Sequence, residues 1–105
     1  MSKRQRTPVF IVEDIDDGVV RVSGVLDLAN ARALDQRLSE EDCPMHLDLS
    51  GVEFMDGAAV HVLLAHRERC TGRGQDFQLL AVSPSVERVL DHAGMRPMFL
   101  TEQLR

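Results

Sequence analysis

Two short apolar runs near the start of the chain predict a β-hairpin. Residues 8–12 and 19–22 are rich in valine, isoleucine and phenylalanine, which strands favour. Residues 13–18 separate the runs, contain four acidic side chains and end on Asp-Gly, a dipeptide typical of tight turns. We therefore expect two antiparallel strands, the second of which ends within residues 24–27.

Three later segments carry apolar residues at helical spacing. The first follows Asn30, whose short side chain we expect to cap the helix. The second follows Asp56, another good N-cap, and covers about residues 57–71. The third begins at Ser83 and Pro84, a hydroxyl cap followed by a proline at the first helical position. Helices at these places would connect the remaining strands.

Three more strands complete the pattern. Residues 45–49 alternate apolar and polar side chains, as in a strand with two unlike faces, and residues 51–56 are expected to form a loop. Residues 77–82 are almost wholly apolar, which indicates a buried central strand, and residues 98–100 resemble a last strand. The order β-β-α-β-α-β-α-β predicts an α/β fold: a mixed sheet of four to five strands, begun by the hairpin, with helices packed on it.

Size and charge narrow the classes of function. The 105 residues suit one domain over residues 8–105, preceded by a flexible arm over residues 1–7. A net charge of -5 and an aromatic content of 4% disfavour nucleic acid as a partner. No apolar run reaches the roughly 20 residues of a membrane helix, and none follows the arm as in a secretory signal. We therefore expect a cytoplasmic protein that does not insert into membranes.

The arm carries the basic residues Lys3, Arg4 and Arg6, which stand close together in an otherwise acidic chain. Termini of this kind are usually solvated and frayed, and this is the expected state. The alternative is an arm that touches an acidic partner.

The sequence nominates no enzyme, metal site or cofactor. His61 and His66 are five residues apart, which does not place them on one helical face as zinc ligands would require. All four histidines are expected to be structural or on the surface: His46, His61, His66 and His92. Three acids fall in the expected hairpin turn, where solvation is a better interpretation than magnesium binding: Asp14, Asp16 and Asp17. Nucleophile elbows, phosphate-binding loops and dinucleotide fingerprints are missing from the sequence.

The two cysteines, Cys43 and Cys70, are expected to lie at the same end of the domain. Cys43 precedes a strand, and Cys70 is near the end of the helix that returns from it. Reduced thiols are the default in a cytosolic protein. The alternative is a regulatory disulfide, a redox pair whose closed loop would add about 3–4 kcal/mol of stability.

Three segments, in their order and spacing, resemble the STAS domain, the fold of the anti-sigma factor antagonists. Residues 24–27 (Gly-Val-Leu-Asp) look like the family's Gly-Glu-Leu/Ile-Asp strand end. Residues 47–56 are similar to its central strand and loop, which lead into the motif Asp-Ser-Ser/Thr-Gly. Residues 79–95 resemble its C-terminal strand and Ser-Pro helix. The resemblance covers about residues 8–101 and agrees with the element order predicted from periodicity.

The chain departs from the family where it is usually regulated. In the family, the Ser or Thr after the loop Asp is phosphorylated by an anti-sigma factor that is also a kinase. Here that position is Gly57, followed by Ala58 and Ala59, so no phosphoacceptor is expected. Val25 also replaces the usual Glu. The resemblance therefore implies that the switch is lost while the docking surface can remain.

By resemblance, the chain is a binding domain that docks an anti-sigma factor, a histidine-kinase-like ATPase, or a related regulator. The docking would be constitutive, and the domain itself a monomer or weak dimer. The partner-binding residues would be Asp27, Asp56, Gly57, Ala58 and Ala59. The alternative is that the three small residues only relieve local packing and that the partner surface has decayed.

Two other classes of function stay open. A STAS subunit of a lipid-transport ABC system, which binds the ATPase of the transporter, needs no phosphoryl switch and so suits Gly57. A small-molecule sensor ranks below it, because aromatic residues are scarce and the sequence indicates no large apolar pocket. An enzyme ranks last.

Overall fold

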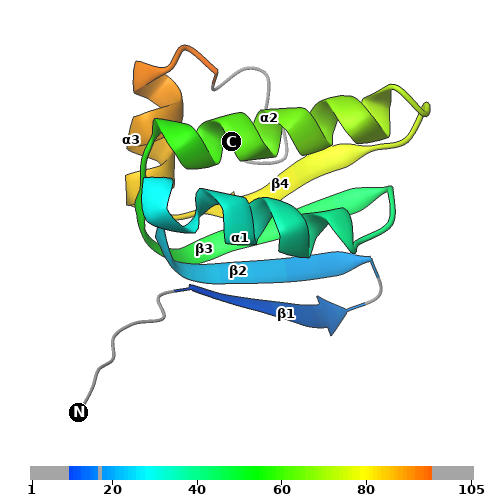
Figure 1. The fold of residues 1–105 in the computed structure, drawn as a ribbon, viewed down its shortest axis with the longest axis horizontal. Coiled ribbons are helices and arrows are strands. Elements are labelled where there is room, and N and C mark those ends of the chain that lie inside the picture. Colours follow the sequence, from blue (N-terminus) through cyan, green and yellow to red (C-terminus); the bar gives the residue numbers. More distant parts are fainter. Residues whose placement is uncertain (1–9, 17, 96–105) are drawn as a thin grey trace.

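A computed structural model describes residues 10–16 and 18–95 and shows a β-sheet with two long helices on one face (Figure 1). The predicted arm and the predicted strand over residues 98–100 lie outside the described residues. The elements follow one another as β1 (Phe10–Asp16), β2 (Val19–Leu26), α1 (Leu28–Ser39), β3 (Met45–Met55), α2 (Gly57–Thr71), β4 (Phe77–Val82) and α3 (Pro84–His92).

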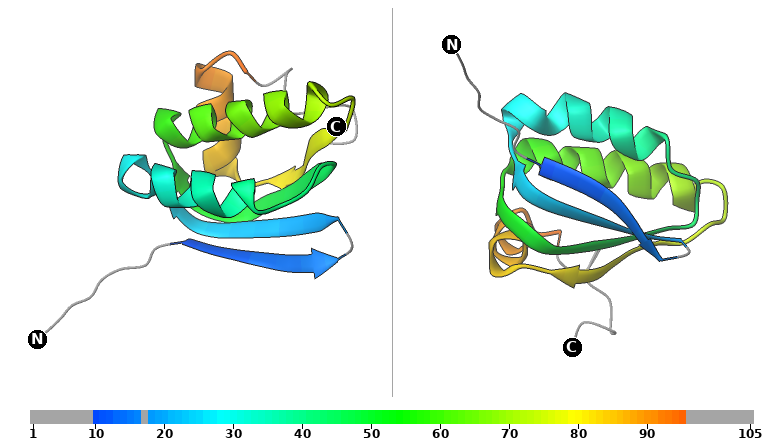
Figure 2. Two further views of the ribbon diagram at one scale, coloured as in Figure 1. Left: turned by 45° about the vertical axis from the view of Figure 1, so that its right-hand side comes forward. Right: turned by 90° about the horizontal axis from the view of Figure 1, so that it is seen from below.

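The sheet has the strand order β1-β2-β3-β4. β1 is antiparallel to β2, whereas β2, β3 and β4 are mutually parallel. The predicted mixed sheet with an N-terminal hairpin is thus confirmed, with four strands in the described part of the chain. Helices α1 and α2 lie side by side over the sheet, and α3 lies near its end (Figure 2). The order of the parallel strands places the ends of β2 and β3 beside the starts of α1 and α2.

β3 is longer than the sequence predicted, because residues 51–55 continue the strand instead of forming a loop. The pairing of β2 with β3 shifts register, and the two backbones come close there. A Cβ built on Gly51 would lie 2.8 Å from the Cβ of Ser23, so glycine permits this approach. The extension buries Val52 and Met55, which are each 2% exposed. It carries the chain to the point where α2 begins.

β1 also extends beyond its predicted end, through Asp16. Asp14 and Asp16 therefore lie on a strand, although the sequence placed them in the turn, and both are exposed as expected. The chain reverses at Gly18, whose φ of 76° favours glycine because it has no Cβ. Asp17 lies outside the described residues.

The cap of α1 differs from the prediction. Asp27 is the N-cap, and its Oδ1 accepts a hydrogen bond of 3.1 Å from the backbone N–H of Asn30. Asn30 is inside the helix, where its Nδ2 donates to the carbonyl oxygen of Val25 over 2.8 Å. α1 therefore begins at Leu28, three residues before the start expected from a cap at Asn30. Asp27 has the extended backbone typical of an N-cap.

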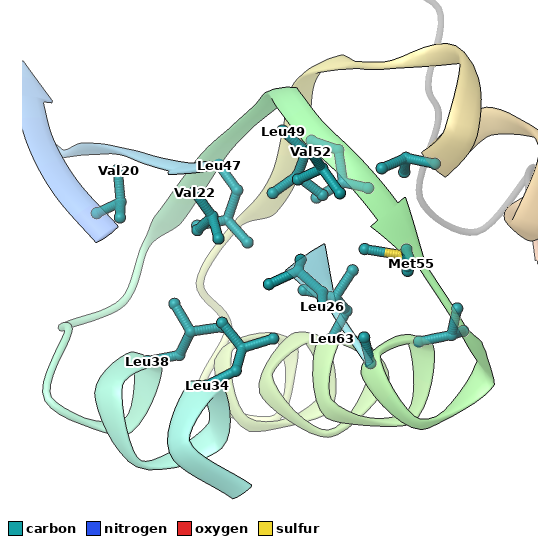
Figure 3. Close-up of a cluster of buried hydrophobic side chains, with 14 of the residues drawn as sticks. Val20, Val22, Leu26, Leu34, Leu38, Leu47, Leu49, Val52, Met55 and Leu63 are labelled. Atoms are coloured by element: carbon teal, nitrogen blue, oxygen red, sulfur yellow. The ribbon is translucent and has the colours of Figure 1, made fainter. Parts of the chain in front are cut away.

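The hydrophobic core fills the space between the sheet and the two long helices. Figure 3 shows leucines of α1 and α2 pointing toward strand residues of β2 and β3. The leucines of α1 that the sequence placed on one face, Leu34 and Leu38, are indeed buried. Other large, fully buried side chains are Leu26, Met45, Leu47, Leu49, Leu63, Leu79 and Leu90. Their burial fixes how both long helices lie on the sheet.

A partly buried polar network also connects α1 and α2. His66 is 4% exposed, and its Nε2 lies 2.7 Å from Oδ1 of Asp35. Arg69 donates to the carbonyl oxygens of Leu38 and Glu41, at 3.2 and 3.3 Å. His66 is thus a buried structural histidine that bridges two helices.

The described residues contain no candidate metal cluster and no helix that could span a membrane. His61 and His92 are exposed, and His46 is partly buried. In residues 10–16 and 18–95, no three His, Cys, Asp or Glu side chains are grouped so as to hold a metal ion. Within the same ranges, every helix is too short or too polar to cross a bilayer.

The cysteines are joined by a disulfide, whereas the sequence favoured reduced thiols. The loop after α1 turns back to the end of α2, so that the Cα atoms of Cys43 and Cys70 are 5.4 Å apart and their sulfurs 2.08 Å. Both residues lie at the same end of the domain, as predicted. The bond fixes the loop before β3 to the C-terminal end of α2. A regulatory role for this pair stays a prediction.

Reduction of this disulfide is expected to lower the free energy of unfolding by about 3–4 kcal/mol, since the bond closes a loop with a sequence separation of 27. Urea unfolding with and without a phosphine reductant measures the change. The variant Cys43→Ala/Cys70→Ala is the control, and it should unfold alike in both buffers. Equal stability of the parental protein in both buffers would contradict the expectation.

Asp48 is held as a carboxylate on the sheet face away from α1 and α2. Burial by itself raises the pKa of Asp48, but hydrogen bonds from Ser50 and from Arg21 outweigh it, so the pKa is lowered. Ser50 donates through its hydroxyl over 2.6 Å and through its backbone N–H over 2.9 Å. The Arg21 guanidinium is 3.2 Å from Oδ2 of Asp48. Arg21 and Asp48 thereby connect β2 to β3.

Protonation of Asp48 at low pH should therefore lower the free energy of unfolding. Because its folded pKa is lowered, its contribution is present above the ordinary aspartate pKa of about 3.9 and is lost as the pH falls through the folded value. Asp48→Asn should lower the free energy of unfolding at neutral pH and reduce the loss between about pH 6 and pH 3. Urea unfolding at both pH values tests this, with Asp42→Asn as the exposed control. An unchanged pH dependence in Asp48→Asn would refute it.

Candidate partner-binding site

Asp56 caps α2 at the predicted position. Its backbone is extended, and its Oδ1 accepts hydrogen bonds from the N–H groups of Ala58 (2.9 Å) and Ala59 (3.4 Å). These N–H groups have no partner within the helix, so the carboxylate both satisfies them and complements the positive end of the helix dipole. The first turn of α2 is therefore ordered by a single side chain.

The same carboxylate also holds the start of α1. Oδ2 of Asp56 accepts a hydrogen bond of 3.0 Å from the N–H of Leu28, the first residue of α1. The backbone N–H of Asp56 in turn donates to the carbonyl oxygen of Leu26 over 3.2 Å. The starts of both helices lie together beside the ends of β2 and β3 (Figure 1). This place, formed by Asp27, Leu28, Phe54 and residues 56–59, is called the corner below.

The structure brings the predicted partner-binding residues together but exposes them unequally. Gly57 is exposed, whereas Asp27, Asp56 and Ala58 are partly buried. Ala59 is fully buried at 0% exposure, so its expected contact with a partner is wrong for this structure. It lies on the inner side of α2, where a methyl group packs into the core. Ala59 packs in the core below the corner. The other four predicted residues are at least partly exposed: Asp27, Asp56, Gly57 and Ala58.

Packing does not require glycine at position 57. A Cβ built on Gly57 would meet no heavy atom within 4 Å, and the backbone there does not have the positive φ that favours glycine. A serine would therefore fit without strain. This argues against the alternative that Gly57 merely relieves local crowding.

Two large apolar side chains at the corner were missed by sequence reasoning. Leu28 is 77% exposed and Phe54 is 50% exposed. Phe54 lies on β3, one residue before the buried Met55, and pairs with Val25 of β2. Alternation along β3 gives no signal for the exposure of Phe54, because Val52, two residues earlier, is buried and the pairing of β2 with β3 shifts register between them. Contiguous exposed apolar surface marks sites that bind proteins, whereas single exposed apolar side chains are common.

The fold and the corner together define a STAS-type α/β domain, and comparison with known proteins agrees. The sequence model of the family described as "Mlab, STAS domain" matches residues 10–101. Since this match covers most of the chain, the chain belongs to that STAS family.

A curated relative is the anti-sigma-F factor antagonist RsfA of Mycobacterium tuberculosis, which is 28% identical over 82 residues. That alignment covers 72% of this chain and 64% of the relative, so this chain spans less than two thirds of that protein. The crystal structure of an anti-sigma factor antagonist from Mycobacterium paratuberculosis is 32% identical, with a TM-score of 0.70. It covers 87% of this chain, which covers 81% of it.

The anti-sigma factor antagonist SpoIIAA in its unphosphorylated form shares the fold. It has a TM-score of 0.69 at 21% identity, with 90% of each chain covered. The predicted membership of the STAS family of anti-sigma factor antagonists is thereby confirmed.

Removal of the Asp56 carboxylate should loosen both helix starts. Asp56→Ala is expected to lower the free energy of unfolding by about 1–2 kcal/mol, because it removes the cap of α2 and the acceptor for Leu28. Asp56→Asn keeps one side-chain oxygen and should lose less. Urea unfolding measures both, with the exposed neighbour Glu53→Ala as the control. A loss no larger than that of Glu53→Ala would count against the double role of Asp56.

Proposed function

We propose that this chain is a binding domain of the anti-sigma factor antagonist type, which docks an anti-sigma factor or a related regulator through the corner. The supporting relatives are the two mycobacterial anti-sigma factor antagonists. The contacting residues would be Asp27, Asp56, Gly57 and Ala58, with Leu28 and Phe54 as apolar anchors. The activity is binding, and no chemical step is assigned to the corner.

One observation carries the proposal: the exposed start of α2 has room for a hydroxyl side chain and lacks one. Gly57 is exposed and uncrowded, and Leu28 on α1 and Phe54 on β3 are also exposed. The partner can therefore approach the backbone of α2 closely. Docking at the corner would therefore require no covalent modification of this chain.

The absence of a hydroxyl at residues 57–59 makes the docking constitutive. A phosphoserine carries about −1.5 to −2 charges. At ~6 Å from a carboxylate of the partner, with an effective dielectric constant of ~20, the repulsion would be roughly 4–6 kcal/mol. The negative charge would also stand next to Asp56. Because residues 57–59 have no hydroxyl to accept a phosphoryl group, neither the repulsion from the partner nor that from Asp56 can arise. The corner then stays able to bind.

A second candidate is the STAS subunit of a lipid-transport ABC system, docked on the ATPase of the transporter. Its support is the match to a STAS domain model together with the lack of a hydroxyl at Gly57. Such a subunit would use the same corner and would also need no phosphoryl switch. The two candidates differ in the partner, which is a regulator of a sigma factor in one and a transporter ATPase in the other.

Capture from native lysate on the tagged chain, followed by protein identification, separates these candidates. The partner so identified is then used for titration. Phe54→Ala is expected to weaken binding by about tenfold or more, because buried aromatic anchors dominate interface energies. The control is Ala93→Ser, an exposed position at the far end of α3. Equal affinities for Phe54→Ala and the parental chain would remove the corner from the interface.

The phosphorylation prediction needs the partner kinase and ATP. The parental chain should gain no phosphate, whereas Gly57→Ser should gain one phosphate mass and then bind more weakly. Intact mass and peptide mapping measure the modification. A phosphate on Ser50 or Ser85 of the parental chain would contradict a constitutive corner. Ser50 is exposed on β3, and the Ser85 hydroxyl donates to the carbonyl oxygen of Glu53, next to the corner.

A further inference from the structure

The two cysteines of the disulfide differ in their exposure to solvent. Cys70 is 0% exposed and belongs to the hydrophobic core. Cys43 is only partly buried, and it lines an open pocket of about 640 Å³, called the acidic pocket below. A disulfide exchanges when a thiolate attacks one of its two sulfurs, so the rate depends on access to the attacked sulfur. Within the described residues, Cys43 therefore carries the sulfur that a thiol in solution can reach.

The acidic pocket lies at the starts of β2 and β3, and its charged lining residues are all acids. The described residues place no lysine or arginine in the lining, and its acids are Asp14, Asp16, Glu41 and Asp42. Asp16 and Glu41 already take part in other interactions. Asp14 and Asp42 are exposed and form no ion pair with another described residue. Asp42 is also the residue directly before Cys43.

Arginines near the cysteines leave this negative charge in place. Arg37 pairs with Glu41, and the hydrogen bond to Glu41 is the main cause of the raised pKa of Arg37, whereas Asp14 adds the smallest attraction. Arg69 donates to two backbone carbonyl oxygens, at the end of α1 and in the loop after it. Neither arginine lines the acidic pocket. A thiol that approaches Cys43 therefore meets a net negative charge.

We propose that this disulfide exchanges through the sulfur of Cys43, and that the acidic pocket favours thiols that carry a positive group, such as aminothiols. The pocket thus makes Cys43 a charge-selective site for the formation of mixed disulfides. Selection acts on the rate of exchange, because the carboxylates change how often a thiolate of a given charge reaches the sulfur.

The exchange takes place in two balanced steps. In the first, the thiolate of an aminothiol attacks Sγ of Cys43, a new S–S bond forms there, and Sγ of Cys70 leaves with the electron pair of the broken bond. In the second, another aminothiol thiolate attacks the aminothiol sulfur of the mixed disulfide and releases Cys43 as a thiolate. Each released thiolate takes up one of the two protons that the aminothiols lost. Two aminothiols are thereby oxidised to one small disulfide, and the protein disulfide is reduced to two thiols.

The charge of the reacting thiol sets the expected preference. The thiolate of 2-aminoethanethiol also carries an ammonium group and has no net charge, whereas the thiolate of 2-mercaptoethanesulfonate carries two negative charges. Asp14 and Asp42 repel the sulfonate thiolate and attract the ammonium group of the aminothiol. Both carboxylates are exposed, so salt should screen this difference.

Reduction of the full chain by these two thiols, at about 0.02 M and 0.5 M NaCl, tests the proposal. Acid stops the exchange, and maleimide labelling followed by intact mass measures the freed thiols. Each rate constant is expressed per thiolate and divided by that for a small uncharged disulfide, which removes the intrinsic reactivity of each thiol. The corrected rates should favour 2-aminoethanethiol by about fivefold or more at low salt and by less than about twofold at high salt.

Charge variants locate the selection at the acidic pocket. Asp42→Asn and Asp14→Asn each remove one carboxylate, so each should lower the low-salt preference by about twofold. The matched control is Glu53→Gln, which removes an exposed carboxylate at the other end of the sheet and should keep the parental preference. Urea unfolding checks that the variants are folded, and either pocket variant is informative if the other fails to fold.

Peptide mapping of the mixed disulfide identifies the attacked sulfur. Early in the reaction, the aminothiol should be on Cys43 and the maleimide on Cys70. If the second step is too fast for this species to accumulate, the rate preference and its loss in the pocket variants decide the outcome.

Four results would overturn the proposal. The first is a parental chain that keeps two free thiols in air, and the second is an aminothiol attached to Cys70. The third is equal corrected rates for the two thiols at low salt. The fourth is a Glu53→Gln variant that loses as much preference as Asp42→Asn. These measurements involve no partner protein, so failure of this proposal is distinguishable from failure of the corner proposal.

Discussion

The arrangement of the molecule depends on the carboxylate of Asp56, which accepts hydrogen bonds from the starts of both α1 and α2. The backbone of Asp56 also bonds to the end of β2. Two helices and two parallel strands thus meet at one charged side chain. Buried leucines set the distance of the helices from the sheet, but they are not directional. The bonds of Asp56 fix where the helices begin, and this defines the corner.

The two ends of the sheet differ in the residues that they expose and in the contacts that hold them. At the ends of β2 and β3, the corner combines exposed Leu28 and Phe54 with an uncrowded Gly57. At their starts, the Cys43–Cys70 disulfide and the Arg69 hydrogen bonds hold the loop before β3.

The chain keeps the architecture of its family. Solved structures that share this fold include SpoIIAA in its phosphorylated and unphosphorylated forms, at TM-scores of 0.63 and 0.69. Here the position after the capping Asp56 is glycine, although the space would hold a larger residue.

The sequence by itself determined the element order, the caps at Asp56 and Ser83 and the buried face of α1, because capping and periodicity are local properties. Only the tertiary structure decided that residues 51–55 continue β3, since that depends on pairing with β2. It also decided the disulfide and the second bond of Asp56, which join residues 27 and 28 positions apart. Burial of Ala59 and exposure of Phe54 likewise follow from long-range packing. Sequence spacing cannot specify such contacts, because they form between elements that are distant along the chain.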